Sequence, residues 1–395
     1  MRRPQLEVAD IFCARGSEYR VAHRGHLSLG QLKVMSAIER CRTAELGGHR
    51  LHCSKCETDT IAYNSCRNRH CPKCQAQAAE RWLERQRQDV LPIPYFHVVF
   101  TLPEALRAIA YQNKDAVYDL MFKIVAETLL TIAADKKHLG ARIGITAVLH
   151  TWGSSLVHHP HLHCIVTGGG LSPDKRQWIA SRPHFFLPVK VLGALFRNRF
   201  LKALGTAHDK GELSFFGEQK ILADPGRFEE HLRPLRKTNW IVYAKRSLAG
   251  PEAVLTYLSR YTHRIAIANR RLVAFGARGV TFRYKDYRNG KTRWKSMTLD
   301  TNEFIRRFLQ HVLPKGFHRV RHYGLFANAT RCDNLKLARQ RLKAEPIEPK
   351  TDSEAATTEE KPCSFTCRQC GAPLTVVEIL VPQHPARAPP QRQAA

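Results

Sequence analysis

The sequence predicts an α+β protein with a small metal-binding module at its N-terminus and a basic β-hairpin region towards its C-terminus. Three observations support this fold class. Six of the twelve cysteines fall between Cys41 and Cys74. Strand and helix patterns then alternate between residues 91 and 270. From residue 271 onward, alternating apolar and polar residues are interleaved with many Lys and Arg residues.

The central region has the element order of a ferredoxin-like fold. Apolar runs and helical spacing of apolar residues predict the order β-α-β-β-α-β, followed by one more helix. The expected strands are 95–100, 143–151, 161–167 and 239–244, and the expected helices are 104–138, 190–204 and 252–262. We expect Gly168, Gly169 and Gly170 to end the third strand.

Composition changes divide the chain into four regions. We expect residues 1–90 to form an N-terminal domain that holds the cysteine cluster and ends in a basic amphipathic helix over 75–90, and residues 91–270 to form the central domain. Residues 271–340 contain a β-ribbon over 272–299, with a hairpin turn at Asn289-Gly290 and a helix over 303–312. Residues 341–395 read as a linker, a possible zinc knuckle and a disordered tail.

The charge of the chain points to a polyanionic partner. Its 395 residues carry 63 Lys and Arg against 34 Asp and Glu, a formal net charge of +29. Nucleic acid is the commonest soluble polyanion. The sequence has no signal-peptide pattern and no apolar run long enough to span a membrane, so we expect a cytoplasmic, nucleoid-associated protein without a membrane partner. In that reducing compartment, clustered cysteines indicate metal binding.

The cysteine spacing predicts zinc. Cys53-x2-Cys56 and Cys71-x2-Cys74 have the spacing of a zinc ribbon, in which four thiolates surround one Zn²⁺. Four further residues of ligand type are interleaved with these and could form a second site, or could be surface or supporting groups: Cys41, His49, Cys66 and His70.

A further knuckle is suggested near the C-terminus. Cys363, Cys367 and Cys370 would need a fourth ligand, either His384 or Cys332, and neither spacing is diagnostic. The alternative is that these cysteines are ordinary thiols. The expected zinc content is therefore one or two ions in the N-terminal module, with one more possible here.

Two histidines share one face of a predicted strand. Side chains alternate along a strand, so His161 and His163 point the same way while Leu162 points to the core. His150, at the end of the preceding strand, could reach the same face as a third metal ligand. We expect His158 and His159 to be solvated turn residues. The alternative is that His161 and His163 have a structural role.

Two tyrosines share one face of a predicted helix. Tyr257 and Tyr261 are four residues apart, and Arg260, His263 and Arg264 lie among them. A core aromatic stripe is the alternative, but cations are unusual neighbours for one. Phenols beside cations have lowered pKa values and make better nucleophiles. Such a phenol can attack a DNA phosphate and release a 3′ hydroxyl.

Four motifs together resemble the rolling-circle transposases of insertion-sequence-91 type. They are CRNRHCPKCQ at 66–75, HPHLH at 159–163, YLSRYTHR at 257–264 and LPKGFHRVRHYGL at 313–325. These transposases are HUH nucleases with two tyrosines and an N-terminal zinc-binding domain. The resemblance extends over about residues 35 to 330.

The resemblance implies an enzyme that nicks and joins single-stranded DNA at the ends of a mobile element. It implies that His161 and His163 hold Mg²⁺ or Mn²⁺, and that Tyr257 and Tyr261 are the nucleophiles that form 5′-phosphotyrosine intermediates. The motif does not identify the third metal ligand, so His150 remains the candidate from strand pairing. The partners would be single-stranded element ends and target DNA.

A basic stretch with aromatic residues suits single-stranded DNA. Between Arg260 and Lys295 there are eleven Lys and Arg and one acid, Asp286. Cations can bind phosphates while aromatic rings stack on bases; the alternative is a solvated hairpin face whose rings pack on the core. The expected DNA-binding residues are Arg260, Arg264, Arg270, Arg271, Arg283, Tyr284, Lys285, Lys291, Arg293 and Trp294.

Two other functions remain open from the sequence. A rolling-circle replication initiator or plasmid relaxase would share the histidines and tyrosines, but not usually the zinc module. The other is a non-catalytic zinc-ribbon protein that binds nucleic acid, in which the same histidines and tyrosines only support the fold.

Overall fold

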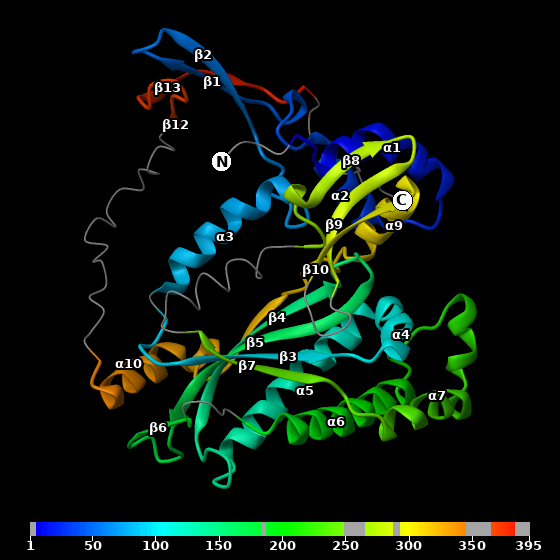
Figure 1. The fold of residues 1–395 in the computed structure, drawn as a ribbon, viewed down its shortest axis with the longest axis vertical. Coiled ribbons are helices and arrows are strands. Elements are labelled where there is room, and N and C mark those ends of the chain that lie inside the picture. The colour runs from blue at the N-terminus through cyan, green and yellow to red at the C-terminus, as the bar shows by residue number, and fades with distance from the viewer. Residues whose placement is uncertain are drawn as a thin grey trace, which may run out of the picture.

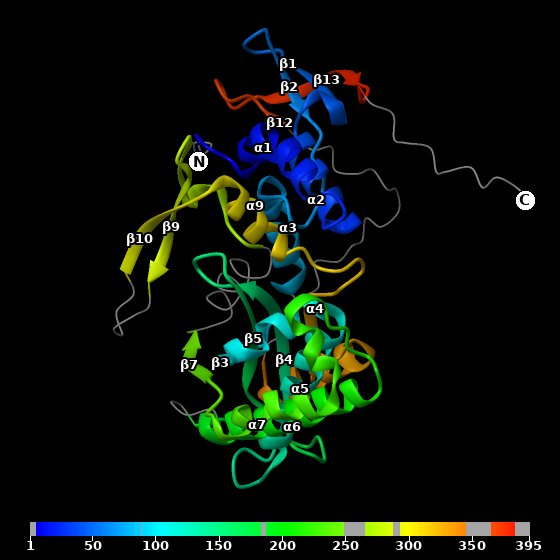
Figure 2. The ribbon, with the colours of Figure 1, turned by 90° about the vertical axis from the view of Figure 1, so that its right-hand side faces the viewer.

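The computed structural model describes residues 5–87, 89–182, 187–248, 265–286, 293–344 and 365–383. Within these residues the strands form three sheets, and helices cover one face of the largest (Figures 1 and 2). The mixed α and β composition agrees with the predicted class.

The central sheet holds the strands of the predicted core. Its order is β11-β4-β5-β3-β7, with every neighbouring pair antiparallel and β6 paired to β5. The strands are β3 (Tyr95–Thr101), β4 (Arg142–Trp152), β5 (His158–Leu171), β6 (Trp178–Ala180), β7 (Val242–Leu248) and β11 (Val320–Gly324). The four predicted strands are present, and β11 is an additional edge strand with no counterpart among the predicted elements.

Helices cover the apolar face of this sheet, and most of them lie below it in Figure 1. They are α4 (Arg107–Gln112), α5 (Lys114–Ala134), α6 (Val189–Asp209) and α7 (Pro225–Lys237). Side chains at alternate strand positions, such as Val98, Leu162 and Ala147, are buried against the helices in one hydrophobic cluster. The intervening positions therefore face the opposite side of the sheet, where the candidate histidines lie.

The glycines of β5 do not end the strand, so that prediction is wrong. β5 continues through Gly168, Gly169 and Gly170 to Leu171. A Cβ atom at Gly170 would lie 2.2 Å from the backbone oxygen of Arg142 on β4. The glycines are therefore explained by close strand approach, which is the other common reason for glycine inside a strand.

A helix after the β-ribbon, α9, packs both on the ribbon and on the first N-terminal helix. Phe12 of α1 and Phe308 of α9 make an edge-to-face contact with ring centroids 5.3 Å apart, and Phe282 packs on Phe304 at 5.9 Å. These elements share one buried cluster. They are α1 (Val8–Ala22), α2 (Leu29–Arg40), β8 (Leu272–Gly276), β9 (Gly279–Asp286), β10 (Arg293–Leu299) and α9 (Thr301–Gln310).

The ends of α2 and α9 follow from their capping residues. Ser28 accepts a hydrogen bond from the Gln31 amide at the start of α2, and Asp300 accepts from the amides of Asn302 and Glu303 at the start of α9. The predicted ribbon over 272–299 is present as β8, β9 and β10, and the predicted helix over 303–312 is α9. The hairpin turn at Asn289-Gly290 and the helix over 252–262 lie outside the described residues.

The third sheet joins a segment of the N-terminal region to a segment near the C-terminus, as Figure 1 shows. Its order is β12-β13-β1-β2, and β1 pairs with both β2 and β13. The strands are β1 (Gly48–Cys53), β2 (Thr58–Tyr63), β12 (Phe365–Thr366) and β13 (Pro373–Leu380). The remaining helices are α3 (Pro72–Arg87), α10 (Arg331–Leu342) and the short turns η1 (Ala44–Leu46), η2 (Glu104–Leu106), η3 (Gly217–Ala223), η4 (Asn269–Arg271) and η6 (Asn328–Thr330). Among the described helices, none has the length and apolar character needed to cross a membrane.

Candidate functional site

Three histidines converge on the face of the central sheet opposite the helices. The register pairs His150 of β4 directly with His161 of β5, and pairs Val148 with His163, so all three side chains share one face. The ring centroids of His150 and His163 are 4.3 Å apart, and those of His161 and His163 are 4.9 Å apart. One ring nitrogen from each histidine lies within 4.8 Å of the others, a spacing that suits a shared metal ion.

Burial keeps the imidazoles of His161 and His163 neutral. It lowers the pKa of His161 to about 4 and holds the pKa of His163 well below its ordinary value. Neutral imidazole is the form that binds metal. The Nδ1 atom of His161 lies 2.7 Å from the His159 carbonyl oxygen, which can only accept. Nδ1 therefore carries the proton and Nε2 presents its lone pair.

A fourth histidine supports this group. His97 of β3 lies on the same face, and its Nε2 atom is 2.8 Å from Nδ1 of His163. No sequence motif marks this residue. Its signal was a single histidine inside an otherwise apolar and aromatic strand, which resembles an ordinary core position until the strand pairing is known.

The two neighbouring histidines do not lie in a solvated turn, so that prediction is wrong. Both His158 and His159 belong to β5. His158 is buried, its Nε2 atom is 2.8 Å from the Tyr118 hydroxyl oxygen, and its ring stacks against His311. It joins β5 to α5 and to the end of α9 as part of the packed structure.

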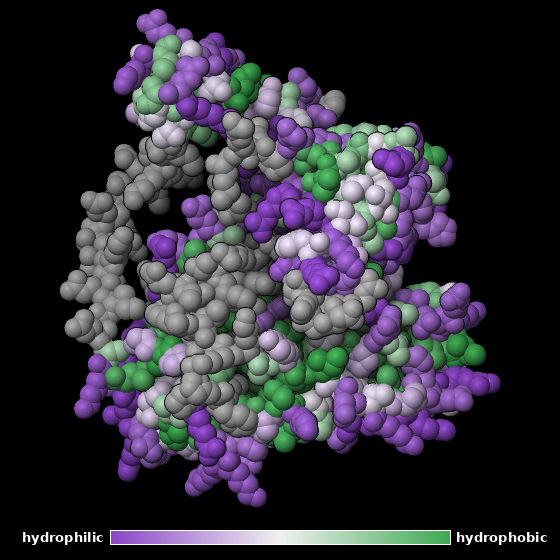
Figure 3. Space-filling model, viewed as in Figure 1, coloured by the Kyte–Doolittle hydropathy of each residue, from purple (hydrophilic) through white to green (hydrophobic). Residues whose placement is uncertain are grey.

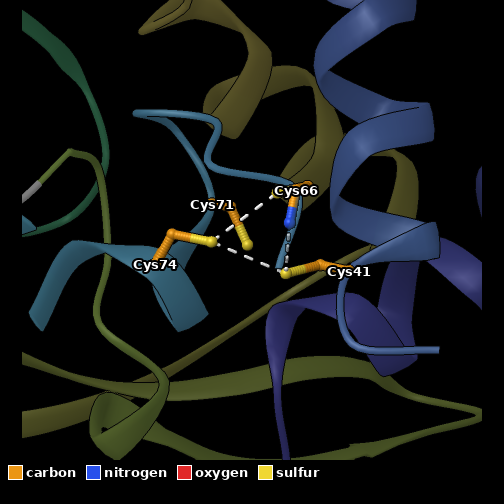
Figure 4. Close-up of side chains that lie close together, drawn as sticks. All are labelled: Cys41, Cys66, Cys71 and Cys74. Atoms are coloured by element: carbon orange, nitrogen blue, oxygen red, sulfur yellow. Dashed lines mark hydrogen bonds between the residues drawn. The ribbon is translucent and has the colours of Figure 1, made fainter. Parts of the chain in front are cut away.

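The first cysteine group lies where α2 ends and α3 begins. Four sulfur atoms converge there, as Figure 4 shows. The Sγ atom of Cys74 is 3.6 Å from that of Cys41 and 3.7 Å from that of Cys66, and Cys71 completes the group. Four thiolates at this spacing suit a tetrahedral Zn²⁺.

A second cysteine group joins distant parts of the chain. Cys53 and Cys56, at the end of β1, lie beside Cys367 and Cys370, which precede β13. The expected grouping of Cys53 and Cys56 with Cys71 and Cys74 is therefore wrong. Sequence spacing shows which cysteines form a knuckle, but the tertiary structure decides which knuckles meet.

The other expected zinc ligands fall outside these groups. His70 accepts a hydrogen bond at Nε2 from the Leu313 amide at 3.1 Å, and burial lowers its pKa to about 3. His49 lies in β1 beside Phe365. Exposed Cys332 starts α10 and belongs to neither group. Cys363 and His384 lie outside the described residues.

Two of the four sequence motifs contact each other. Besides the bond from Leu313 to His70, the Arg69 guanidinium donates to the carbonyl oxygens of Pro314 and Phe317. The cysteine motif is therefore fastened to the loop before β11, the edge strand next to β4. This contact ties the zinc-binding region to the sheet that carries the histidines.

The β-ribbon carries cations and an exposed aromatic ring. The guanidinium carbon of Arg283 and the Nζ atom of Lys285 each lie 5.4 Å from the centre of the Trp294 ring. Trp294 is 50% exposed. Arg270 and Arg293 are exposed and Tyr284 is half-buried. This ribbon can offer both a stacking surface and positive charge.

Some of the residues expected to bind DNA or to act in catalysis have a different position from the one expected. One is buried in the protein, and others lie outside the described residues. Arg271 is buried and donates to the carbonyl oxygens of Arg283 and Ser154, so its guanidinium is engaged within the protein. Phe282 is also part of the core. The residues that lie outside the described part of the chain are Tyr257, Arg260, Tyr261, Arg264 and Lys291.

Comparisons with known proteins define the class. A family model described as "Transposase zinc-binding domain" matches residues 11–102, and one described as "Putative transposase" matches residues 144–334. The first range contains the first cysteine group, and the second contains the three histidines. Together they indicate a transposase that carries a zinc-binding domain.

The relatives agree with this class. A Sinorhizobium fredii (strain NBRC 101917 / NGR234) protein named "Putative transposase y4qJ" is 54% identical over 375 residues, which cover 94% of each chain. A Pseudomonas savastanoi pv. phaseolicola protein named "Transposase for insertion sequence element IS801" is 25% identical over 336 residues, 81% of this chain and 76% of the relative. The chain belongs to the insertion-sequence-91 family of transposases. No solved structure matches it.

Family membership establishes the general activity. The protein is the transposase of an insertion sequence, and its substrate is DNA. Its N-terminal region is a zinc-binding domain, and the cysteine groups have the ligand chemistry for Zn²⁺.

Proposed function

We propose that the protein is an HUH endonuclease and strand transferase that cleaves and rejoins single-stranded DNA during rolling-circle transposition. The histidines His150, His161 and His163 would hold Mg²⁺ or Mn²⁺, and Tyr257 and Tyr261 would be the nucleophiles. The strand order β7-β3-β5-β4, with helices on one face, supports a ferredoxin-like core for this site.

The observation that carries the proposal is the convergence of three histidines. They lie on the adjacent strands β4 and β5, with a ring nitrogen of each within 4.8 Å of the others. His161 presents Nε2 because its Nδ1 proton is held by a backbone carbonyl, and His163 is supported from behind by His97. A bound divalent cation would neutralise charge that develops on the scissile phosphate.

The tyrosine step conserves atoms and charge. The phenol oxygen of Tyr257 or Tyr261 attacks the phosphorus, and the bond from phosphorus to the 3′ oxygen breaks. The phenol proton passes to the departing oxygen, giving a free 3′ hydroxyl and a 5′-phosphotyrosine. Attack by another 3′ hydroxyl reverses the step and joins strands. Two tyrosines allow two linkages to be held in succession.

The residues that flank the tyrosines support their access to the histidines. β7 ends at Leu248, which pairs with Tyr95 on the strand that also carries His97. On the other side, Ile265 is buried in the same cluster as Trp152, whose ring stacks on His150. Tyr261 is four residues from Ile265, so an extended chain spans at most about 14 Å between their Cα atoms.

The ribbon is the proposed path for single-stranded DNA. Arg283, Lys285 and Trp294 combine phosphate-binding charge with a ring on which a base can stack. In this proposal residues 1–90 form the zinc-binding domain, 91–270 the nuclease domain, 271–340 the DNA-binding region, and 341–395 a linker with a zinc knuckle and tail. The partners are element ends and target DNA.

A covalent adduct tests the proposal directly. The protein is incubated with a labelled single-stranded oligonucleotide that spans an element end, with Mg²⁺ or Mn²⁺, and adducts that survive denaturation are separated by size. We expect an adduct that requires the metal and is lost in the double variant Tyr257→Phe, Tyr261→Phe. An unchanged adduct in that variant would exclude these nucleophiles.

His161→Ala separates the metal role from folding. We expect it to abolish the adduct while the oligonucleotide still binds with its wild-type affinity. Equal loss of binding and cleavage would indicate that His161 supports the fold instead. If the wild-type protein binds every tested end and forms no adduct with any of them, it is a non-catalytic DNA-binding protein and the proposal is wrong.

A further inference from the structure

We propose that Cys53, Cys56, Cys367 and Cys370 hold a second Zn²⁺ that fastens the C-terminal strand β13 to the N-terminal zinc-binding domain. Neither matched family range contains Cys367 or Cys370, since the ranges end at residues 102 and 334. The site is independent of the nuclease chemistry proposed above. Its role is to join β1 to β13, drawn blue and red in Figure 1.

The sulfur positions fit one tetrahedral ion. The Sγ atoms of Cys53 and Cys370, 317 residues apart, are separated by 3.7 Å, and those of Cys56 and Cys367 by 4.0 Å. A tetrahedral zinc with bonds of about 2.3 Å places its sulfur ligands roughly 3.8 Å apart. All four atoms lie within 4.8 Å of one another, so each knuckle supplies two corners of one tetrahedron.

The two knuckles have matching backbone turns. In the first, the Glu57 amide donates to the Cys53 carbonyl oxygen at 2.7 Å, and Glu57 has a φ of 52°. In the second, the Gly371 amide donates to the Cys367 carbonyl oxygen at 2.9 Å, and Gly371 has a φ of 74°. Each turn closes over its Cys-x2-Cys pair and directs both sulfur atoms to the same side. Two independent segments thus adopt the same geometry facing each other.

The sheet beside this site needs a metal because it lacks a large core. β13 pairs with β1, and Arg50 forms an ion pair of 2.9 Å with Glu378 across the strands. Apolar residues of β13 remain exposed, including Val376 and Ile379 at 51% and 71%. Figure 3 shows green and purple residues side by side on this sheet. A small sheet with so little buried apolar surface depends on a metal for stability.

The first cysteine group provides an internal comparison. Cys41 and Cys71 are fully buried and belong to the hydrophobic cluster of α1, α2 and α9. That group does not include the C-terminal segment, so loss of one zinc ion should leave the other in place. We therefore expect two zinc ions per full-length chain, bound by separate ligand sets.

Zinc content and amide exchange test the proposal on the full-length protein. We expect the wild type to carry two zinc ions by native mass spectrometry and Cys370→Ser to carry one. In Cys370→Ser the amides of β13 should exchange with solvent much faster, while those of β5 keep wild-type protection. Cys332→Ser is the matched control, since Cys332 is an exposed cysteine in neither group; it should keep both ions.

Several outcomes would overturn the proposal. One is a single zinc ion in the wild type, and another is two ions in both Cys370→Ser and Cys367→Ser. A further contrary outcome is a mass without metal that matches a disulfide between these cysteines. It would show that a covalent bond, and not zinc, links the two segments. If Cys370→Ser loses one ion but β13 keeps its protection, the metal does not fasten the strand. Failure of Cys370→Ser to fold is resolved with Cys367→Ser, which removes the opposite ligand.

Discussion

The Nε2 atom of His97 lies 2.8 Å from Nδ1 of His163, and the two rings are nearly parallel, with an interplanar angle of 4°. A proton shared between these nitrogens determines which ring nitrogen of His163 carries hydrogen. When His97 accepts the Nδ1 proton, His163 presents Nε2 towards His150 and His161. Partners behind a metal ligand orient it and raise its basicity.

His97 is therefore a positioning residue in the proposed nuclease. We expect His97→Ala to raise the Mn²⁺ concentration needed for half-maximal adduct formation by about 10- to 100-fold, the range typical for loss of such a partner. His97→Gln, which can still form a hydrogen bond, should restore most of the metal affinity. Cleavage is measured across a Mn²⁺ titration. If His97→Ala needs the same Mn²⁺ concentration as the wild type for half-maximal adduct formation, His97 is not a positioning residue.

The proposed third metal ligand, His150, can be tested by comparing alanine variants of His150 and His159, which lie on neighbouring strands. We expect His150→Ala to lose metal-dependent adduct formation, because its ring faces both His161 and His163. His159→Ala is the control, since the His159 side chain is not part of the group whose nitrogens converge. Mn²⁺ binding by calorimetry gives a readout that does not depend on cleavage. Loss of binding in His159→Ala alone would reassign the ligand.

Trp294 and Arg283 should contribute to DNA binding in different ways. We expect Trp294→Ala to weaken binding of a single-stranded oligonucleotide by about 1–3 kcal/mol, the value of one base stacked on a ring. Arg283→Ala should lower the slope of log affinity against log salt by about 0.7, as expected for one phosphate contact on a single strand. Affinities are measured by fluorescence anisotropy at several salt concentrations.

An exposed cation outside the ribbon serves as the control for this comparison. Arg15 lies on α1, exposed and paired with Glu18 at 2.8 Å, so Arg15→Ala should change neither the affinity nor the salt slope. Equal effects of Arg15→Ala and Arg283→Ala on affinity would mean that DNA is attracted by the net charge of +29 as a whole and does not bind along the ribbon.

The sequence predicted elements whose signal is local. Alternation along β4 and β5 placed His150, His161 and His163 on one face, and the helical spacing of apolar residues predicted α5 and α6. The cysteine grouping was not predictable in the same way, because two identical Cys-x2-Cys knuckles can pair with each other or with a distant one. β13 was missed for a related reason: its partner β1 lies more than 300 residues earlier.

Glycine in β5 illustrates how the same residue signals two structures. Gly168, Gly169 and Gly170 resemble a strand terminator in the sequence, but the structure uses them where backbones approach closely. Pairing distances of this kind appear only after the strands are assembled, so no local pattern distinguishes the two cases.

The close approach at Gly170 has a measurable consequence. A Cβ atom there would lie 2.2 Å from the Arg142 carbonyl oxygen, a backbone atom that cannot rotate away. We expect Gly170→Ala to lower the free energy of unfolding by about 1–3 kcal/mol, as overpacking does.

Gly205→Ala is the matched control, because Gly205 lies in α6 with nothing within 4 Å of the added Cβ. That change should raise stability by up to about 1 kcal/mol, since alanine favours helix over glycine. Urea unfolding followed by tryptophan fluorescence measures both. A neutral Gly170→Ala would mean that β4 and β5 can separate locally at no cost, contrary to the close pairing that brings the histidines of these strands together.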